Sequence, residues 1–484
     1  MGKKITIEPV TRVEGHGKVT IHLDDKNNLE ESRFHIVEFR GFERFVQGRP
    51  YWEAPVLVQR LCGICPVSHH LAAAKALDVI VGAGSDGLTP TGEKMRRLMH
   101  YGQIFQSHAL HFFHLCSPDL LFGIDSDPLK RNVIGVAMEH KDLAVQGVMM
   151  RKFGQEIIKA TAGKKIHGTG AIPGGINKNL SIEERDKFLK GEGDLNIDKM
   201  IDWAQGAIDF FKSYHAKNRD LIDNFAAFPS SHLSLVRKDG ALDLYHGVIR
   251  SVDAEGKKII DDVDTQEYLS HIGEEVKSWS YMKFPFMLTK GKQHGWYRVG
   301  PLARLSTCDF IPTPLAQKEF EEYKAYTKGK PSTSSMHMHW TRLIETLHSA
   351  EMMKKLLNDP DLQGNDLVTK GKKVPEGIGI IEAPRGTLFH HYQIDDNDQI
   401  KMANLIVSTT NNNTPMNRAV NEAAKSHISG QPEITEGMKN AVEVAIRAYD
   451  PCLSCATHAI GKMPLVISMY DSMGNMVDQK RKDC

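Results

Sequence analysis

Two Cys-x-x-Cys pairs near opposite ends of the chain constrain the fold more than any other feature of this sequence. Cys62 and Cys65 form the first pair, and Cys452 and Cys455 form the second, in a chain of 484 residues. Two thiolates three residues apart can grip one metal ion when a tight turn or a helix start brings both sulfurs to one side. If both pairs bind one centre, the two ends of the chain must meet, and the metal closes a loop of nearly the whole chain.

The residues around the first pair indicate its place in the fold. Pro66 directly follows Cys65, and proline suits the first turn of a helix. We therefore expect the first pair at a helix N-terminus, where the helix dipole favours thiolate charge. Gly63, between the two cysteines, is expected to permit a backbone conformation that a bulkier residue would resist.

The pairs by themselves allow three kinds of site. Each could be an isolated redox dithiol, although neither lies in the strand-turn-helix pattern of thioredoxin-like proteins. The four cysteines could bind a structural zinc ion that joins the chain ends, or soft thiolates could select nickel or iron. A structural zinc site needs no acid, arginine or histidine beside it. The flanking residues therefore favour a reactive centre: Arg60, His69, Asp450 and His458.

The composition excludes several classes of function. Hydrophobic residues make up 41% and charged residues 25%, and the formal net charge of +1 gives no basic excess for nucleic-acid binding. Seven cysteines are an odd number in a large chain, which argues against a disulfide framework; Cys116 and Cys308 are expected in the core. No stretch reaches the roughly 20 apolar residues of a membrane span, and the N-terminus has no signal-peptide core, so we expect a cytoplasmic protein.

The pattern of apolar residues predicts an α+β chain that is predominantly helical. An N-terminal β region (residues 1–54) should contain strands at residues 4–9, 17–23 and 33–39. Residues 227–300 have the pattern of a mixed insert with short strands, such as residues 242–252. We find no repeat or linker and expect residues 1–484 to form one integrated domain. Helical periodicity, with Thr91 as a candidate cap, predicts helices at residues 68–81, 91–115, 143–162, 197–225, 314–326, 339–357 and 436–447.

Four motifs together carry a specific resemblance. They are Thr11–His16, Arg60–Cys65 followed by His69, Glu382–Gly386 and Asp450–His458. In this order they resemble the motifs of nickel-iron hydrogenase large subunits, and the similarity runs essentially end to end. The resemblance implies that family's fold, with a long-helix core and a small N-terminal β-sheet. Three stretches are similar in particular to the hydrogenase subunit of cytoplasmic NAD-reducing bidirectional enzymes: Val37–Glu43, Trp279–Pro285 and Ala448–Cys452.

The resemblance implies a nickel–iron centre that all four cysteines bind as thiolates. Cys65 and Cys455 would also bridge to an iron that carries carbon monoxide and cyanide, whereas Cys62 and Cys452 would be terminal ligands of nickel. The implied reaction is the reversible heterolytic cleavage of H2 into protons and electrons. Soft sulfur ligation with an open position at the metals suits this reaction.

The resemblance also implies groups that act beside the metals. Cys452 and Glu14 would take the proton first, because burial can bring the pKa of a carboxyl group toward the operating pH. Arg385 would lie over the metals on the cyanide side, with Asp450 paired to it or orienting the site. Without the motifs, Glu14 is interpreted as a surface acid, Arg385 as a loop arginine paired with Glu382 or another acid, and Asp450 as a turn acid before proline.

Three residues are expected around the ligands of the iron. Pro384 and Ser408 would form the pocket for the diatomic ligands, with Ser408 donating a hydrogen bond to cyanide. Val407 stands where the family often has proline. His69 would donate a hydrogen bond to a bridging sulfur; without the motif it is interpreted as a core histidine.

A second metal site and a processing site follow from the same resemblance. Glu43 and His458 would bind a second metal, usually magnesium, that ties the C-terminus into the core. In the family, maturation removes a C-terminal extension after the histidine of the last motif, which corresponds here to residues 459–484. A tail at this place can hold the site open while the metals are loaded.

The chain itself offers no route for the electrons. It has no spare cysteine cluster for iron–sulfur centres and no glycine-rich dinucleotide fingerprint. The resemblance implies a small iron–sulfur subunit together with diaphorase subunits that bind flavin (FMN) and NAD, so that H2 oxidation is coupled to NAD reduction. Two alternatives stay open: a hydrogen-sensing regulatory subunit, which would share every ligand, and a non-catalytic scaffold with four cysteines on zinc.

Overall fold

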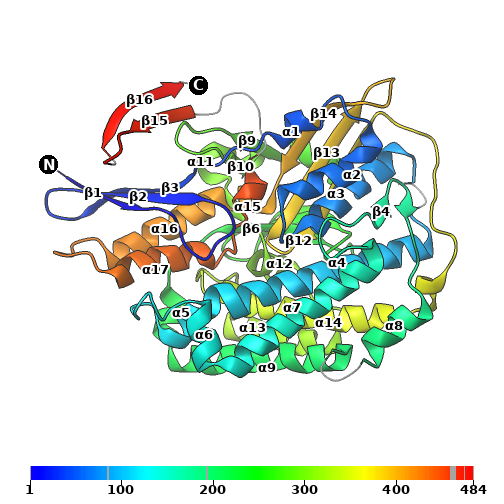
Figure 1. Cartoon of the computed structure of the whole chain (residues 1–484), viewed down its shortest axis with the longest axis horizontal. Coiled ribbons are helices and arrows are strands. Elements are labelled where there is room, and N and C mark those ends of the chain that lie inside the picture. The colour runs from blue at the N-terminus through cyan, green and yellow to red at the C-terminus, as the bar shows by residue number, and fades with distance from the viewer. Residues whose placement is uncertain (1, 84–86, 192–194, 458–464, 474, 483–484) are drawn as a thin grey trace.

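Long helices form the largest layer of the structure (Figure 1). The computed structural model describes residues 2–83, 87–191, 195–457, 465–473 and 475–482. α4 packs against both α7 and α14, and α14 also packs against α9. The predicted long-helix core is confirmed by the four longest of these helices: α4 (Pro90–Leu110), α7 (Lys141–Ala162), α9 (Ile197–Lys217) and α14 (His337–Leu357).

Two glycines let α4 and α7 pack closely. A Cβ atom on Gly154 would lie 2.6 Å from the carbonyl oxygen of Gly102, and one on Gly102 would lie 3.2 Å from that of Gly154. A side chain on Gly154 would therefore push the two helices apart, so this packing requires glycine there.

Shorter helices surround the long ones. α3 (Pro66–Ile80) packs against the strands β12 and β13, described below, and carries the first cysteine pair at its N-terminal end. α16 (Asn413–His427) packs against α17 (Glu436–Arg447) and against the N-terminal sheet. The others are α1 (Phe42–Phe45), α2 (Ala54–Leu57), α5 (Ser117–Phe122), α6 (Val133–Glu139), α8 (Ile182–Leu189), α10 (Arg219–Asn224), α11 (Gly291–His294), α12 (Pro301–Thr307), α13 (Pro314–Tyr326) and α15 (Ser408–Asn411).

Two three-stranded antiparallel sheets frame the site. The N-terminal sheet contains β1 (Lys3–Ile7), β2 (Gly17–Leu23) and β3 (Leu29–Ile36), as predicted with shifted ends. The second contains β12 (Glu376–Ala383), β13 (Gly386–Ile394) and β14 (Ile400–Ile406), and α3 covers it. The other strands form smaller sheets: β4 (Ala171–Ile172) with β5 (Gly175–Ile176); β11 (Tyr297–Arg298), β6 (Ser231–Val236), β7 (Val248–Val252) and β8 (Lys258–Val263); β9 (Ile272–Glu275) with β10 (Phe284–Met287); and β15 (Leu465–Tyr470) with β16 (Met476–Lys482).

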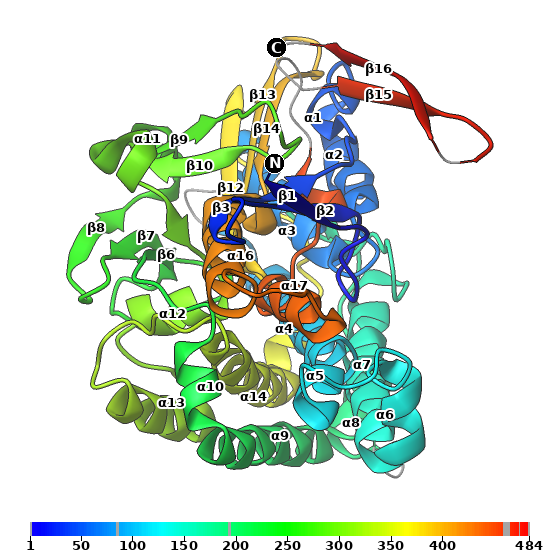
Figure 2. The same cartoon turned by 90° about the vertical axis from the view of Figure 1, so that its left-hand side faces the viewer.

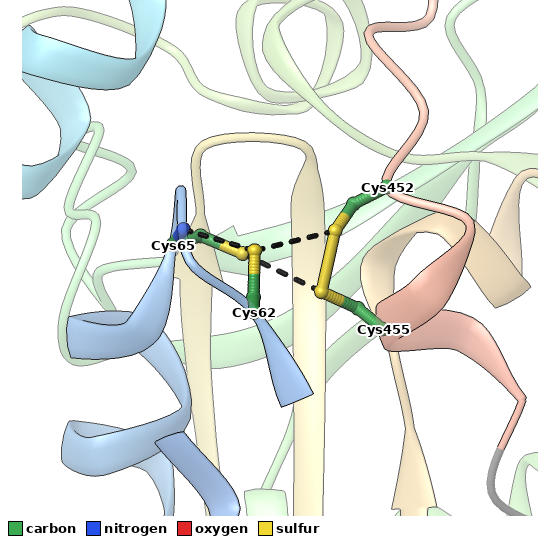
Figure 3. A group of neighbouring side chains, drawn as sticks. All are labelled: Cys62, Cys65, Cys452 and Cys455. Atoms are coloured by element: carbon green, nitrogen blue, oxygen red, sulfur yellow. Dashed lines mark hydrogen bonds between the residues drawn. A yellow bond between two sulfur atoms is a disulfide. The ribbon is translucent and has the colours of Figure 1, made fainter. Parts of the chain in front are cut away.

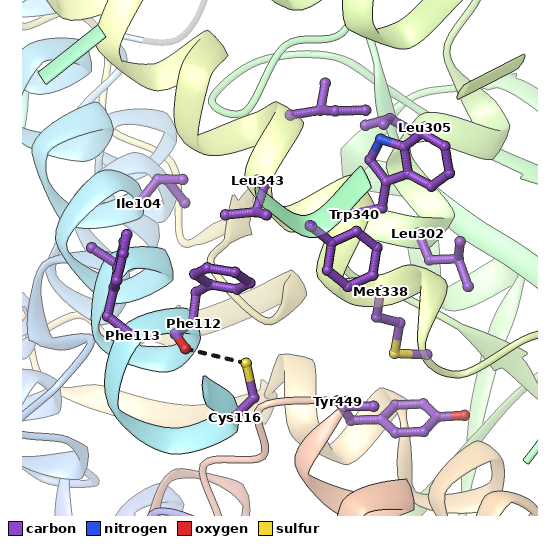
Figure 4. Close-up of a cluster of buried hydrophobic side chains, with 14 of the residues drawn as sticks. Ile104, Phe112, Phe113, Cys116, Leu302, Leu305, Met338, Trp340, Leu343 and Tyr449 are labelled. Carbon is purple, nitrogen blue, oxygen red and sulfur yellow. Dashed lines mark hydrogen bonds between the residues drawn. The ribbon is translucent and has the colours of Figure 1, made fainter. Parts of the chain in front are cut away.

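The main hydrophobic core connects the long helices to the segment before the second cysteine pair (Figure 4). Ile104 of α4, Leu305 of α12 and Leu343 of α14 are buried in it, together with Tyr449. The hydroxyl of Tyr449 accepts a hydrogen bond from Arg298 Nε at 3.2 Å. Burial of apolar surface stabilises this cluster. Because Tyr449 is held in the cluster, the position of the residues that directly follow it in the chain is also restricted.

Several predicted elements differ from the structure. α4 begins at Pro90 because Thr89, not Thr91, caps it: Thr89 Oγ1 accepts from Gly92 N at 3.0 Å. The predicted helix at residues 197–225 is two helices, because α9 ends at Lys217 and α10 begins at Arg219. Only residues 248–252 of the predicted strand at 242–252 are extended as a strand. No helix in the described part of the chain is long and apolar enough to cross a membrane.

Candidate metal centre

The structure brings the four cysteines of the two pairs together (Figure 3). All four are buried, and their Sγ atoms lie within 4.8 Å of one another. Cys62 Sγ is 3.4 Å from Cys452 Sγ, and Cys65 Sγ is 3.8 Å from Cys455 Sγ, across 390 residues of sequence in each case. The chain ends therefore meet at the two pairs, as a shared metal centre requires.

The sulfur spacing fits a metal bound by thiolates. A tetrahedral ion with metal–sulfur bonds of about 2.3 Å separates its sulfurs by about 3.8 Å, close to both distances between the pairs. Cys452 and Cys455 are joined as a disulfide in the structure. Binding of a metal by both residues requires two free thiolates in place of this bond.

The first pair lies at the N-terminus of α3, as predicted, with Cys65 as the N-cap residue. The backbone N–H groups of Ile64 and Cys65 both donate to Cys62 Sγ at 3.1 Å. Burial opposes ionisation of Cys62, but the hydrogen bond from Cys65 and the charge of Arg385 outweigh it and lower the pKa of Cys62. The hydrogen bond to Cys62 and burial raise the pKa of Cys65. The expected need for Gly63 is wrong, because a Cβ atom there would meet open space.

The second pair follows a turn at Asp450. The φ angle of Asp450 is 52°, in the left-handed region that aspartate tolerates better than most residues. The N–H of Cys452 donates to Thr409 Oγ1 at 3.0 Å. Glu14 forms an isolated parallel bridge with Cys452, and the N–H of Leu453 donates to the carbonyl oxygen of Glu14 at 2.9 Å. Backbone contacts thus attach the N-terminal motif to the second pair.

The side chain of Glu14 contacts the same pair. Cys452 Sγ lies 3.0 Å from Glu14 Oε2, and the N–H of Ser454 donates to the same oxygen at 3.2 Å. The side chain is half-buried. With the disulfide reduced, a Cys452 thiol at this distance can transfer its proton directly to the carboxylate.

Arg385 lies in the tight turn between β12 and β13, where Ala383 pairs with Gly386. Gly386 has a φ angle of 134°, and a Cβ atom there would lie 2.3 Å from Val299 Cγ2, so the turn requires glycine. Arg385 Nη2 donates to Asp450 Oδ1 at 3.0 Å, and Nε donates to the carbonyl oxygen of Asp450 at 2.5 Å. Burial raises the pKa of Asp450 despite the charge of Arg385.

Glu382, the other candidate partner of Arg385, is paired with Arg304. Arg304 Nη1 donates to Glu382 Oε2 at 2.9 Å, and Nε and Nη2 donate to the carboxylate of Glu345 at 2.5 and 2.6 Å. Arg304 also donates to the carbonyl oxygen of Pro384 at 3.3 Å. The acid that pairs with Arg385 is therefore Asp450 and not Glu382, and Arg304 fixes the turn that carries Arg385.

A small cavity of about 10 Å³ lies beside the cysteines. Arg385 Nη1 and Asp450 Oδ2 are buried, and neither has a hydrogen-bond partner among the residues that the structure describes. A buried donor without an acceptor costs free energy, so the site suits a small ligand that accepts a hydrogen bond, as cyanide on an iron does. The cavity is lined by Cys65, Ser68, His69, Ala383, Pro384, Arg385, Leu388, Val407, Ser408, Thr409 and Cys452.

Pro384, Ser408 and His69 all line this cavity, but two of them make other hydrogen bonds. Ser408 Oγ donates to the carbonyl oxygen of Gly386 at 2.7 Å. His69 Nδ1 lies 3.1 Å from His390 Nε2, and burial lowers the pKa of His69 to about 3, so this imidazole is neutral. Donation by Ser408 to cyanide and by His69 to a sulfur stay predictions.

The predicted magnesium site is only partly described. Glu43 is buried, and this burial raises its pKa; Lys283 Nζ lies 3.8 Å from Glu43 Oε1. The other predicted ligand, His458, lies outside the described residues. The N–H of Arg40 donates to the carbonyl oxygen of Thr457 at 3.1 Å. The residue before His458 therefore contacts the segment that carries Glu43, and the magnesium site stays a prediction.

Three residues of the site were missed from the sequence. Thr409 lines the cavity and accepts from the N–H of Cys452, and its position next to the predicted Ser408 was a usable signal. His390 contacts His69, and Arg304 holds the Arg385 turn, but neither belongs to a motif. No local pattern could have identified these two residues.

Comparison with known families and proteins gives matches over most of the chain. Residues 4–39 match a family described as HoxL-like, and residues 40–126 and 243–458 match the nickel-dependent hydrogenase family. The chain is 52% identical over 489 residues to the NAD-reducing hydrogenase HoxS subunit beta of Cupriavidus necator, and the match covers 100% of both chains. It is 44% identical to one subunit of the F420-non-reducing hydrogenase vhc of Methanococcus voltae, covering 97% of this chain and 98% of the relative.

Solved structures give the same picture of the fold. A crystal structure of an NAD+-reducing NiFe hydrogenase in the H2-reduced state matches with a TM-score of 0.91 and 53% identity, covering 94% of this chain and 99% of that one. A Ni-Fe-Se hydrogenase from Desulfovibrio vulgaris Hildenborough shares the fold with a TM-score of 0.76 at 23% identity, covering 95% of this chain and 100% of that one.

Proposed function

Because this chain belongs to the nickel-dependent hydrogenase family, we propose that its four cysteines bind a nickel–iron centre at which H2 is cleaved reversibly into protons and electrons. The electrons pass through partner subunits to NAD, in line with the similarity to NAD-reducing hydrogenases. One observation carries the proposal. Four buried cysteines from both ends of the chain converge beside a cavity that Arg385 lines.

The cysteines divide the ligand roles. All four thiolates would hold nickel, and by the resemblance Cys65 and Cys455 would also hold the iron, whereas Cys62 and Cys452 would bind nickel alone. When bound, the centre supplies an electron-accepting site that polarises H2. The two N–H groups that donate to Cys62 Sγ and the N-terminus of α3 stabilise negative charge on this pair.

Cys452 and Glu14 carry the proton away. The sulfur and Glu14 Oε2 are 3.0 Å apart, which supports direct transfer. The N–H of Ser454 stabilises the carboxylate before the proton arrives. A half-buried position also lets the proton leave toward solvent.

Arg385 lines the side of the cavity at which the diatomic ligands of the iron would lie. Asp450 fixes its guanidinium at two points, so that Nη1 is left to donate to a diatomic ligand of the iron. Burial opposes the charge of Arg385, but Asp450 and the cysteines outweigh it and raise the pKa of Arg385, which keeps the group protonated. Pro384 forms part of the cavity wall, and Ser408 is in place to turn its hydroxyl toward cyanide.

Two further assignments concern the C-terminal end. Glu43 and His458 bind magnesium, which would neutralise a buried carboxylate whose Oε1 accepts from the N–H of Leu405 at 2.9 Å and lies 3.8 Å from the ammonium group of Lys283. Residues 459–484 are removed during maturation. The described strands of this segment, β15 and β16, pair only with each other within the part of the chain that the structure describes, which is compatible with their loss.

Partner subunits complete the electron path. Cys116 and Cys308 are buried separately, and the described residues contain no second group of four cysteines. A small iron–sulfur subunit therefore takes the electrons from the centre, and diaphorase subunits with FMN deliver them to NAD.

The experiment combines metal analysis with activity. In the purified native complex we expect about one nickel per chain, H2-dependent reduction of an artificial dye and H2-dependent reduction of NAD. Cys65→Ser should abolish nickel binding and dye reduction, whereas Cys308→Ser, at a buried cysteine outside the group, should keep both. Zinc in place of nickel, with no H2 turnover, would support the zinc scaffold instead. Dye reduction without NAD reduction would refute only the NAD assignment.

A further inference from the structure

Two histidines and an aspartate form another group of possible metal ligands, where α9, α10 and α14 meet. His215 lies in the last turn of α9, Asp223 lies in α10, and His337 is the first residue of α14. α9 runs along the outer edge of the helical layer in both views (Figures 1 and 2), and Figure 2 shows α10 at one end of it. Both histidine side chains are 5% exposed and that of Asp223 is 29% exposed, so the group is reachable through the aspartate.

The three side chains converge on one oxygen atom. His215 Nε2 is 2.8 Å and His337 Nε2 is 3.0 Å from Asp223 Oδ1, and these three atoms lie within 4.8 Å of one another. A tetrahedral ion with bonds of about 2.0–2.1 Å separates its ligand atoms by about 3.3 Å. The two distances to Asp223 Oδ1 are therefore a few tenths of an ångström shorter than in such a site, and the two imidazole nitrogens lie within 4.8 Å of each other.

Outer hydrogen bonds orient the ligand atoms. Tyr326 donates to Asp223 Oδ2 at 2.5 Å, which leaves Oδ1 to the two imidazoles. Ser332 Oγ lies 2.8 Å from His337 Nδ1. With an ion bound, His337 can donate to Ser332 from Nδ1 and turn the lone pair of Nε2 toward the ion, in place of the Nε2–Asp223 hydrogen bond. Metal-binding histidines typically have their other ring nitrogen fixed in this way.

One positive group lies near the site. The guanidinium of Arg219 lies against the Tyr326 ring, 5.7 Å from its centre, and Tyr326 in turn donates to Asp223 Oδ2.

We propose that His215, Asp223 and His337 bind a divalent transition-metal ion, with Zn²⁺ as the best match. Imidazole and carboxylate are common zinc ligands, and a water molecule would complete a tetrahedral set. The ion joins the end of α9, α10 and the start of α14. Asp223 and His337 are 114 residues apart in sequence, so the ion closes a long loop and stabilises the helical layer.

Another buried trio shows why geometry alone is insufficient. His111, Cys116 and His339 also lie close together. Arg342 Nη1 is 3.2 Å from His339 Nδ1, and burial raises the pKa of Cys116 to about 12, which keeps this thiol protonated. A cation beside a ligand atom and a neutral thiol both disfavour a metal ion at this trio.

The test uses the metal-loaded hydrogenase complex, treated with a chelator and then given Zn²⁺ alone. We expect the parent to bind one more zinc ion per chain than His337→Gln does. Zinc bound at other sites is the same in both proteins and does not contribute to this difference. Zn²⁺ should also raise the Tm of the parent, because an ion that binds only the folded chain stabilises it. In Asp223→Asn the amide oxygen can still accept from both imidazoles, yet zinc affinity should fall about tenfold or more, because the ligand charge is lost.

Two comparisons make the result decisive. His246→Gln removes a histidine that is 46% exposed and paired with Glu93, and it should bind zinc as the parent does. The Tm of Asp223→Asn in chelator should match that of the parent, which separates loss of the ion from loss of the fold. Equal zinc content in the parent and His337→Gln, or undiminished affinity in Asp223→Asn, would show that the group is only a hydrogen-bonded cluster and overturn the proposal.

Discussion

The carboxylate of Glu14 can be replaced without a change of shape, because glutamine is its isosteric amide. One carboxylate oxygen lies 3.0 Å from Cys452 Sγ and accepts from the N–H of Ser454 at 3.2 Å. In Glu14→Gln the amide can keep one of these contacts as an acceptor, or donate to the sulfur instead. A hydrogen bond contributes about 0.5–1.5 kcal/mol, so we expect the free energy of unfolding to change by less than about 1.5 kcal/mol.

The effect on the rate should be much larger, because the amide of Glu14→Gln cannot take up a proton. A positioned acid or base contributes about 10²–10⁴-fold to the rate, which corresponds to about 2.7–5.4 kcal/mol of activation free energy. The distance between Cys452 Sγ and Glu14 Oε2 already allows direct proton transfer. The variant therefore loses the proton acceptor itself, and a movement of the side chain cannot restore it. We expect H2 oxidation to fall by at least about 100-fold.

The assay is H2-dependent reduction of an artificial dye by the complex, expressed per bound nickel. Glu38→Gln is the matched control, because Glu38 accepts from Ser454 Oγ at 3.2 Å and lies on the same side of the second pair. It should keep its rate within about threefold of the parent. A nickel-loaded Glu14→Gln variant with a rate within about threefold of the parent would refute Glu14 as the proton acceptor.

Three further outcomes are expected. Arg385→Lys loses the two-point contact with Asp450, and dye reduction should fall by about 10²–10³-fold while nickel content stays constant; an unchanged rate would remove Arg385 from the mechanism. Arg304→Met leaves two carboxylates buried without their partner, and urea unfolding should show a loss of about 3–5 kcal/mol, against less than about 1 kcal/mol for Arg237→Met at an exposed ion pair. Burial lowers the pKa of four core histidines from 6.5 to about 4, so below pH 6.5 the unfolded chain binds protons that the folded chain does not. Stability should fall between pH 6.5 and about 4 by about 1.4 kcal/mol per pH unit for each histidine, and a Tm that stays constant from pH 7 to pH 5 would contradict this. The four core histidines with the lowered pKa are His70, His100, His108 and His348.

Local chemistry made the first pair predictable. Pro66 after Cys65 and the alanine-rich run behind it place a helix start next to the sulfurs, and the structure has α3 at Pro66–Ile80. The pairing of Arg385 with Asp450 also followed from the motifs, because both residues belong to segments that the resemblance assigns to one site. Sequence patterns therefore identified the groups that contact the centre.

The second sheet was missed for a physical reason. Every residue of β12 after its first is buried, and eight of the nine residues of β13 are buried. Buried strands lack the alternation of apolar and polar residues by which a half-exposed strand is identified. Arg304, which pairs with Glu382 and Glu345, was missed because its partners are distant in sequence. The sheet and the buried ion pairs depend on tertiary contacts that no local pattern contains.

The placement of Glu14 against Cys452 depends on contacts far from the sulfurs. The carboxylate of Asp119 accepts from Arg12 at 2.5 Å and from Arg447 at 2.6 Å, and so connects the N-terminal motif to the end of α17. Arg447 Nε also donates to the carbonyl oxygen of Thr11 at 3.0 Å. α17 leads directly into Asp450 and the second cysteine pair. Protein contacts therefore join the two chain ends independently of the sulfurs, and in this the centre differs from a zinc staple, in which the ion itself holds the ligand segments together.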